Sequence, residues 1–241
     1  MEAKGFAYSY DMLGEAATTA ADARRYFADY ERAIHAIGKA SAGRGIYAGP
    51  GISIKLSALH PRYVRAQADR VMGELLPAVK QLALLSKRYD IGFNIDAEEA
   101  DRLELSLDLL ESLSEIDRDR IGCAGCSGGG LQTQMVTALD GRIKVATMVG
   151  ITCDYREIMF PYKAHCVCNH WPGAMRLTDQ PEITALALPK PIQILTMDDW
   201  TQHFKRDNLA QIQSLYEANG VWDRVDHQYW PTPHTYEDAK R

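Results

Sequence analysis

The sequence has few cysteines and lacks a long apolar run. Five cysteines in 241 residues are an odd number at an ordinary density, which argues against a disulfide framework and fits a reducing compartment. No apolar run approaches the roughly 20 residues that a membrane-spanning helix needs. The start MEAKGFAYSYD also lacks the basic and apolar regions of a secretory signal. We therefore expect a cytoplasmic protein that makes no contact with a membrane.

A concentrated basic surface is also missing. The 27 lysines and arginines are scattered along the chain, and the formal net charge is -5. A protein that binds nucleic acid usually gathers its positive charge on one face, so we expect no nucleic-acid partner. The 46% of hydrophobic residues is enough to form a core in a chain of this length.

Strand and helix patterns alternate along the chain. An alanine-rich stretch over 14–40 predicts one or two helices, which we interpret as an N-terminal helical arm over 1–45. The next segment, 46–115, predicts two βα units. Their expected elements are a strand over 50–59, a helix over 65–90, a strand over 91–99 and a helix over 100–113.

The second half of the chain continues the same alternation. The expected elements are a strand at about 120–126, a helix at about 128–139, strands over 142–150 and 190–197, a helix over 207–219 and a last strand, VDHQYW. Such alternation indicates a parallel sheet covered by helices on both faces. We predict an α/β fold: a three-layer α/β/α arrangement with a mainly parallel sheet.

Gly125-Cys126-Ser127-Gly128-Gly129 has the pattern G-x-S-x-G. It lies between a predicted strand and a predicted helix, which is the context that this pattern needs to present a nucleophilic serine on a strained turn. The backbone amide of Gly128 starts the helix and is the natural first donor of an oxyanion hole. Ser127 is therefore the candidate nucleophile.

A serine nucleophile needs a histidine as base and a carboxylate that orients the histidine. In α/β-hydrolases the chain order is serine, acid, histidine, so both partners should follow Ser127. Asp198 and Asp199 come directly after the strand over 190–197, and His234 lies in the segment WPTPHTYED. His227 is the competing base, but it falls inside the strand pattern VDHQYW.

The cysteines allow an alternative interpretation as a metal or redox site. Zinc needs four convergent ligands, and the candidates are Cys123, Cys126, Cys166 and Cys168, with His165 or His170 nearby. A strand-to-helix turn does not easily direct Cys123 and Cys126 toward one ion. We therefore favour buried cysteines and predict no metal. The stretch HCVCNHWPG then forms a lid or a pocket wall over the serine.

The first part of the chain resembles a known family. The stretches FAYSYDMLGEAATTAADARRYFADYERAIHAIGKA, GPGISIKLSALHPRY and IGFNIDAEEADRLELSLDLLESL closely resemble the start of the proline dehydrogenase domain of bifunctional proline utilisation flavoproteins. That domain is a (β/α)8 barrel that binds FAD, and the resemblance implies that Lys55 and Asp96 lie near its flavin and proline site. The later barrel strands, which carry most flavin contacts and two paired arginines, have no counterpart. We therefore expect no cofactor and no flavin oxidation.

The second part resembles another family. The stretches IGCAGCSGGGLQTQMVTALDGRIKVATMVG, PKPIQILTMDDWT and YWPTPHTYED resemble the second half of α/β-hydrolases of the acetyl xylan esterase and dienelactone hydrolase-like group. This resemblance implies that Ser127 is the nucleophile, that Asp199 rather than Asp198 is the acid, and that His234 is the base.

Together the two resemblances indicate a chimera joined near residue 115. We predict that the two βα units of 46–115 complete the sheet of the hydrolase half, 116–241, so that 46–241 form one domain with an unprotected edge. Such edges are usually covered, so we expect a homo-oligomer. The predicted function is a serine hydrolase that cleaves carboxylic esters, with small short-chain acyl esters as substrates. The alternatives are a truncated FAD-dependent proline dehydrogenase fragment and a catalytically silent folded chimera.

Overall fold

The structure is a computed structural model that describes residues 7–12, 16–97, 102–159 and 173–234. The chain divides into two compact units, Met1–Ile116 and Asp117–Arg241. Each unit has its own sheet and its own cluster of buried hydrophobic residues.

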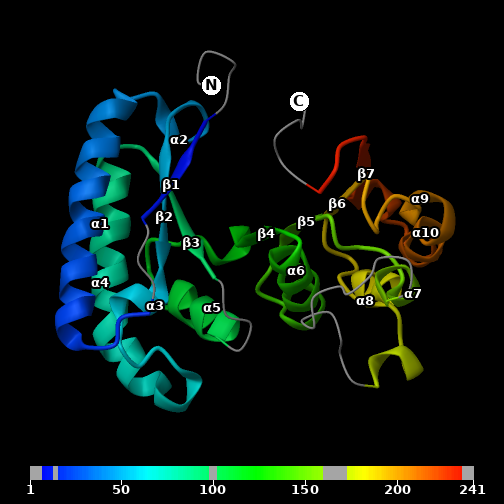
Figure 1. Ribbon diagram of the computed structural model, residues 1–241, viewed down its shortest axis with the longest axis horizontal. Coiled ribbons are helices and arrows are strands. Elements are labelled where there is room, and N and C mark those ends of the chain that lie inside the picture. The colour runs from blue at the N-terminus through cyan, green and yellow to red at the C-terminus, as the bar shows by residue number, and fades with distance from the viewer. Residues whose placement is uncertain (1–6, 13–15, 98–101, 160–172, 235–241) are drawn as a thin grey trace. The chain divides into compact units, whose positions relative to one another are not determined.

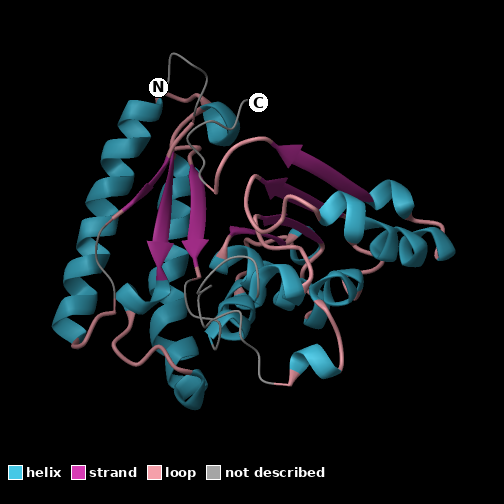
Figure 2. Ribbon diagram, turned by 45° about the vertical axis from the view of Figure 1, so that its right-hand side comes forward, coloured by secondary structure: helices cyan, strands magenta, loops and turns pink. Residues whose placement is uncertain are grey.

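The first unit is built on three parallel strands in the order β1-β2-β3. These strands are β1 (Ser9–Asp11), β2 (Gly51–Lys55) and β3 (Gly92–Asp96), and their arrows run in the same direction in Figure 2. The register of β2 and β3 sets Lys55 directly opposite Asp96. Because both strands end at these residues, Lys55 and Asp96 lie together at the carboxyl edge of the sheet.

Helices α1 and α4 run side by side along the first sheet (Figure 1). The helices of this unit are α1 (Ala20–Ser41), α2 (Gly45–Ala48), α3 (Leu56–Leu59), α4 (Ala68–Arg88) and α5 (Leu103–Ser112). Helix α1 begins with a capping box, in which the Thr19 side chain accepts from the Asp22 amide and the Asp22 side chain accepts from the Thr19 amide. This exchange satisfies two of the amides that a helix start leaves unpaired.

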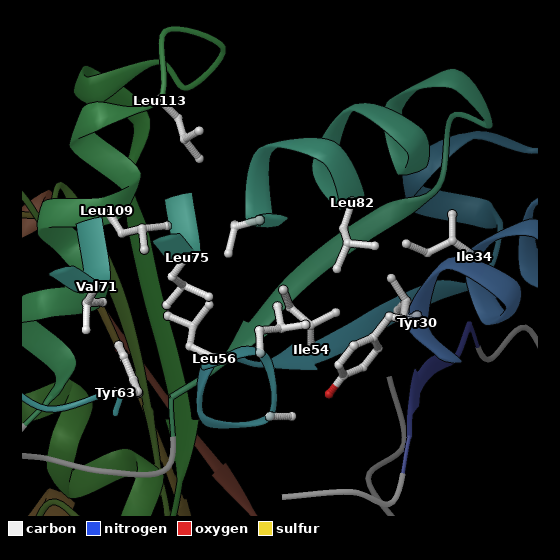
Figure 3. Packing of buried hydrophobic residues seen from close by; sticks show 14 of the residues in the cluster. Tyr30, Ile34, Ile54, Leu56, Tyr63, Val71, Leu75, Leu82, Leu109 and Leu113 are labelled. Carbon is white, nitrogen blue, oxygen red and sulfur yellow. The ribbon is translucent and has the colours of Figure 1, made fainter. Parts of the chain in front are cut away.

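The core of the first unit lies between the sheet and these two helices. Figure 3 shows Tyr30 and Ile34 of α1 beside Ile54 of β2 and Leu82 of α4, and each of the four is at most 2% exposed. The predicted N-terminal helical arm over 1–45 therefore contributes α1 to the core of the first unit. Because α1 has apolar residues three and four positions apart, it buries one face against β2 and α4.

The second unit contains four parallel strands in the order β4-β5-β6-β7. They are β4 (Gly122–Cys126), β5 (Val145–Val149), β6 (Ile192–Met197) and β7 (Val225–Trp230). The α-helices of this unit are α6 (Gly128–Leu139), α7 (Tyr155–Met159), α8 (Gln180–Ala185), α9 (Phe204–Asp207) and α10 (Leu209–Ala218). The buried side chains of β5 and β6 pack against α10 and α8, as Ile194, Ile212 and Ala185 show.

The predicted mixed α/β fold with parallel sheets is confirmed, whereas the predicted single sheet over 46–241 is not observed. Within the described parts of the chain, the strands of 46–115 pair only with each other and with β1. A shared sheet would need a strand of the first unit to pair with one of β4–β7, whereas the first sheet and its core close within the first unit. The unit boundary after Ile116 still lies close to the predicted junction at 115.

No helix in the described part of the chain is both long enough and apolar enough to cross a membrane.

Candidate functional sites

Lys55 is a buried lysine at the carboxyl end of β2. Along this strand Ile52 and Ile54 enter the core with 0% exposure, while alternate residues face the other side of the sheet. The Lys55 side chain is only 4% exposed, and its Nζ lies 2.6 Å from Asp96 Oδ2 and 3.5 Å from Asp11 Oδ2. A buried ammonium is costly unless it is paired, and these two carboxylates provide the pairing.

Tyr30 fixes the backbone at the same position. Its hydroxyl oxygen accepts a hydrogen bond of 3.0 Å from the backbone N–H of Lys55. Burial raises the pKa of the Tyr30 hydroxyl, although the Lys55 N–H opposes that shift. The hydroxyl therefore stays neutral at ordinary pH, and it links α1 to the end of β2 without adding a charge to the site.

A small cavity lies beside the lysine. Its polar lining residues are Lys55, Ser57, Tyr63, Asp96, Arg102 and Ser106. The Tyr63 hydroxyl and Ser106 Oγ are 2.7 Å apart and close one side. The cavity volume is about 10 Å³, which is enough for about one water molecule. A larger ligand therefore has to bind over the open face of the sheet.

The open face of the first sheet is polar. Ser9 Oγ lies 2.9 Å from Ser53 Oγ and accepts a bond of 2.9 Å from Asn94 Nδ2, so one row of hydrogen bonds crosses all three strands. Asp11 and Asp96 extend this face with side chains that are 41% and 37% exposed. Parallel sheets are normally covered on both faces. The polar and accessible face is thus the natural ligand surface of this unit.

The charges at this edge favour a ligand with an amino group. Two accessible carboxylates surround one buried ammonium, so negative charge is in excess and hydrogen-bond acceptors are available. The FAD that the first resemblance implies cannot enter the small cavity. The cavity is far too small for a flavin ring, and the ammonium of Lys55 is already held by Asp11 and Asp96.

Ser127 holds a strained position at the end of β4. Its backbone has φ 56° and ψ -119°, a conformation that costs a residue with a side chain about 1–3 kcal/mol. Its amide donates to the Val149 carbonyl at 2.9 Å, which fixes the turn against β5. A Cβ at Gly125 would overlap the backbone of Gly129, so the first glycine of the pattern is required by close packing.

Asp199 and His234 form a hydrogen-bonded pair in the second unit. His234 Nδ1 lies 2.7 Å from Asp199 Oδ2, and the Asp199 side chain is 3% exposed. The other carboxylate oxygen of Asp199 accepts from the Thr201 amide at 2.7 Å and from the Thr201 hydroxyl at 2.6 Å. The Trp200 ring packs on the imidazole with ring centroids 4.4 Å apart. This arrangement fixes both the carboxylate and the ring of the histidine.

Gly150, which follows β5, connects the two parts of this arrangement. It has φ +61°, and a Cβ built there would lie 2.7 Å from His234 Cε1. His234 therefore occupies the space that a side chain at position 150 would take. Gly150 directly follows Val149, whose carbonyl accepts the hydrogen bond from the Ser127 amide. In the described residues no hydrogen bond joins Ser127 Oγ to His234, so only the acid and the base are directly bonded. Gly128, the predicted oxyanion donor, is the first residue of α6.

The competing candidates have other partners. Asp198 accepts a hydrogen bond from the Tyr229 hydroxyl. His227 Nε2 lies 2.9 Å from Thr196 Oγ1 on the neighbouring strand, and burial lowers the pKa of His227. The geometry thus pairs His234 with Asp199.

The described cysteines show no sign of a metal site. Cys123 Sγ lies 3.3 Å from Thr133 Oγ1, and burial raises the pKa of this thiol. Burial also raises the pKa of Cys153 far above its usual range. No group of three potential metal ligands occurs among the residues that the structure describes. Cys166, Cys168, His165 and His170 lie outside them, as does almost all of the predicted lid.

Several residues of these sites were not found from the sequence. Thr201 could have been found, because Asp-x-Thr in DDWT is the pattern in which an aspartate accepts from a residue two positions later. Asp11, Tyr30 and Gly150 reach their sites from segments far away in the chain. No local pattern in the sequence indicates them.

Comparisons with known proteins support the first resemblance. The family model described as proline dehydrogenase matches residues 1–133 of the 241. Bifunctional protein PutA of Klebsiella aerogenes is 76% identical over 113 residues, which are 47% of this chain and 9% of that protein. The chain spans about a tenth of the length of the curated relatives that it matches.

Solved structures give two kinds of match. A crystal structure of a bifunctional proline utilization A (PutA) protein covers 93% of this chain and 26% of that chain, with 31% identity and a TM-score of 0.50. A methylesterase covers 57% of this chain and 31% of that chain, with 28% identity and a TM-score of 0.49.

These matches contradict the predicted activity. The prediction of a carboxylic ester hydrolase was wrong, because the family model and the highly identical relatives place the chain in the proline dehydrogenase family instead. The match also runs beyond the predicted junction and includes Ser127. The alternative prediction, a fragment of a proline dehydrogenase, is better supported than the hydrolase. We had disfavoured it because the later barrel strands are missing.

Proposed function

Because this chain belongs to the proline dehydrogenase family, we propose that it takes part in proline oxidation by holding proline at the carboxyl edge of β2 and β3. The observation that carries the proposal is the buried Lys55 ammonium between the Asp96 and Asp11 carboxylates. These residues lie within residues 1–133, which the proline dehydrogenase family model matches.

The chemistry of proline suits this edge. Its amino group is a cationic donor at neutral pH, and Asp96 and Asp11 are accessible acceptors on the polar face of the sheet. A hydrogen bond from an ammonium to a carboxylate is among the stronger kinds. Lys55 keeps the two carboxylates in place, and Tyr30 fixes the backbone of Lys55. The residues of the first unit thus bind and orient the amino group of the substrate.

The rest of the reaction needs groups that this unit does not supply. When bound, FAD accepts the electrons that proline loses in this family. The small cavity cannot hold its ring, and a lysine held by two carboxylates is a poor partner for the carboxylate of proline. We therefore limit the proposed role of this chain to recognition of the substrate's amino group.

Calorimetric titration of the chain with L-proline tests this role. We expect binding to be at least tenfold weaker in Asp96→Asn, which removes a charged acceptor. The matched control is Glu104→Gln, which removes an exposed carboxylate paired with Arg65 and should leave the affinity unchanged. The absence of binding to the unmodified chain, or equal binding to Asp96→Asn, would contradict the proposal. Circular dichroism of each variant confirms that the fold is kept.

A second proposal concerns the second unit. We propose that the chain is a chimera whose residues 117–241 have an α/β-hydrolase-like origin, and that Ser127, Asp199 and His234 form one catalytic site with the Gly128 amide as a donor. The bonded acid and base and the strained serine support this proposal. In such a site Asp199 orients His234, and His234 takes the proton of Ser127.

A fluorophosphonate reagent tests this second site, because it reacts with activated serine hydroxyls and needs no knowledge of the substrate. Mass spectrometry should find one label, on Ser127, and the label should be lost in His234→Gln. Ser214→Ala, on α10, is the control and should be labelled like the unmodified chain. Labelling of other serines alone, or no labelling, would contradict the proposal.

A further inference from the structure

Thr201 is a fully buried threonine in the turn that follows β6. It lies two positions after Asp199 and is 0% exposed. Its Oγ1 accepts a hydrogen bond of 3.0 Å from the Met197 amide and donates one of 2.6 Å to Asp199 Oδ1. A hydroxyl has one hydrogen to donate. Because the amide can only donate and the carboxylate oxygen accepts, these two partners allow one orientation of the hydroxyl.

The Thr201 hydroxyl connects the Asp199 carboxylate to the sheet. Met197 is the last residue of β6, and its amide holds Thr201 Oγ1 in place. The Thr201 amide donates to the same carboxylate oxygen, Asp199 Oδ1, at 2.7 Å. Thr201 thus supplies two donors to Oδ1, and the other oxygen, Oδ2, lies 2.7 Å from His234 Nδ1. The rotation of the carboxylate group is therefore set by Thr201.

The orientation of Asp199 determines which nitrogen of His234 carries a proton. A neutral histidine has one ring nitrogen that donates and one that accepts, and the hydrogen bond of one nitrogen fixes the state of the other. Because Nδ1 faces the carboxylate oxygen Oδ2, Nδ1 is the donor and Nε2 is the acceptor. A base that takes the proton of Ser127 needs this form of the ring.

Water cannot easily replace the Thr201 hydroxyl, because both partners are buried. The Asp199 side chain is 3% exposed, so loss of the hydroxyl leaves a buried carboxylate oxygen with one donor fewer. The backbone of the same turn is held separately, since the Asp198 amide donates to the Thr232 carbonyl at 2.9 Å. The turn therefore stays beside the segment of His234 without the hydroxyl, and the hydroxyl sets the direction of the carboxylate.

We infer that Thr201 is a positioning residue of the second site. Its hydroxyl orients Asp199, and Asp199 in turn keeps the proton of His234 on Nδ1. The inference rests on the proposed site of Ser127, Asp199 and His234, and it adds a residue that acts through Asp199. Removal of the hydroxyl should slow the reaction of Ser127 although the three proposed catalytic side chains are unchanged.

The rate of fluorophosphonate labelling at Ser127 tests the inference with three variants. Thr201→Val removes the hydroxyl and keeps the branched shape, and we expect labelling to be at least tenfold slower. Thr201→Ser retains a hydroxyl and should restore nearly the full rate. Thr137→Val is the matched control, because it removes another fully buried hydroxyl, which is bonded to the Thr133 carbonyl in α6. It should label like the unmodified chain. Circular dichroism checks the fold of each variant.

The ring ¹⁵N signals of His234, assigned by their loss in His234→Gln, distinguish positioning from a purely structural role. They are recorded above the pH range in which histidines titrate. The unmodified chain and Thr201→Ser should show the proton on Nδ1, whereas Thr201→Val should show a mixture of both neutral forms. If Thr201→Val keeps the proton on Nδ1, the inference is overturned, whatever the rate of labelling.

Two results of the labelling would also overturn the inference. One is an unchanged rate in Thr201→Val, and the other is a rate in Thr201→Ser as low as that in Thr201→Val. If Ser127 is not labelled in the unmodified chain, the proposed catalytic site fails. The ¹⁵N signals still decide whether Thr201 positions Asp199, because they do not depend on a reaction.

Discussion

Lys55 Nζ on β2 lies 2.6 Å from Asp96 Oδ2 on β3, and the lysine side chain is 4% exposed while the aspartate side chain is 37% exposed. Replacing Lys55 and replacing Asp96 should therefore change the free energy of unfolding by unequal amounts. Asp96→Asn removes the nearer carboxylate from a buried ammonium and leaves it 3.5 Å from Asp11 Oδ2, and we expect it to lower the free energy of unfolding of the first unit by about 2 kcal/mol. Lys55→Met leaves accessible carboxylates that water can solvate, and it should cost less than about 1 kcal/mol.

Urea denaturation followed by far-ultraviolet circular dichroism measures these two changes. All four tryptophans lie after residue 170, in the second unit, so tryptophan fluorescence reports that unit separately. Glu104→Gln removes an exposed ion pair and is expected to change stability by less than about 1 kcal/mol. A larger loss for Lys55→Met than for Asp96→Asn would contradict the assignment of Lys55 as the desolvated partner.

The two units should unfold separately, because each has its own hydrophobic cluster. Ile54 is fully buried, and Ile54→Ala should destabilise the first unit by about 3 kcal/mol through the cavity that it leaves. The dichroism transition should then gain an earlier phase, while the midpoint of tryptophan fluorescence stays the same. An equal shift of both signals would show that the two units unfold together.

The turn at Ser127 should tolerate no side chain at Gly125. Gly125→Ala forces a Cβ against the backbone of Gly129, and we expect a loss of about 3 kcal/mol or more in the second unit, since overpacking against backbone cannot relax by a change of rotamer. At Gly141 a Cβ would meet nothing within 4 Å, so Gly141→Ala is the matched control. Similar fluorescence midpoints for the two variants would refute the geometry of the turn.

His227 should make the stability of the second unit depend on pH. Burial lowers the pKa of His227 in the folded chain, whereas in the unfolded chain a histidine has a pKa of about 6.5. Below that pH the unfolded chain binds the additional proton, so the free energy of unfolding should decrease as the pH falls from 7.5 to 5.5. Replacement of His227 by glutamine should weaken this dependence, as measured by urea midpoints at each pH.

The control for this prediction is His203→Gln. The His203 side chain is 41% exposed, and its replacement should leave the pH dependence as it is in the unmodified chain. If His227→Gln and His203→Gln give the same pH profile, burial of His227 does not control the stability in this range.

Periodicity and turn patterns predicted most elements, because these are local properties of the chain. The predicted helix over 128–139 coincides with α6, and the pairing of Asp199 with His234 agrees with chain order and with the spacing from β6. Strand β1 was missed because Ser9–Asp11 is short and polar. The partition into two sheets was missed as well, since strand pairing is decided by long-range packing and both halves have the same βα pattern.

The function was mispredicted for a related reason. The Gly-x-Ser-x-Gly turn is short and its chemistry is easily recognised. We gave it more weight than the much longer resemblance to proline dehydrogenase domains, because the later barrel strands of that family have no counterpart in this chain. Lys55 and Asp96 are 41 positions apart, and before the structure only the resemblance placed them near one site. The register of β2 and β3 brings them together, and Asp11 and Tyr30 reach the same point from β1 and α1.

The most direct test of the proposed proline site is a titration of the ¹⁵N-labelled chain with L-proline, followed by amide chemical shifts. We expect progressive shifts at the ends of β2 and β3, at Leu56 and Ala97, that are absent in Asp96→Asn, with no change in the amides of β5 and β6. Shifts confined to the second unit, or a spectrum that L-proline leaves unchanged, would contradict it.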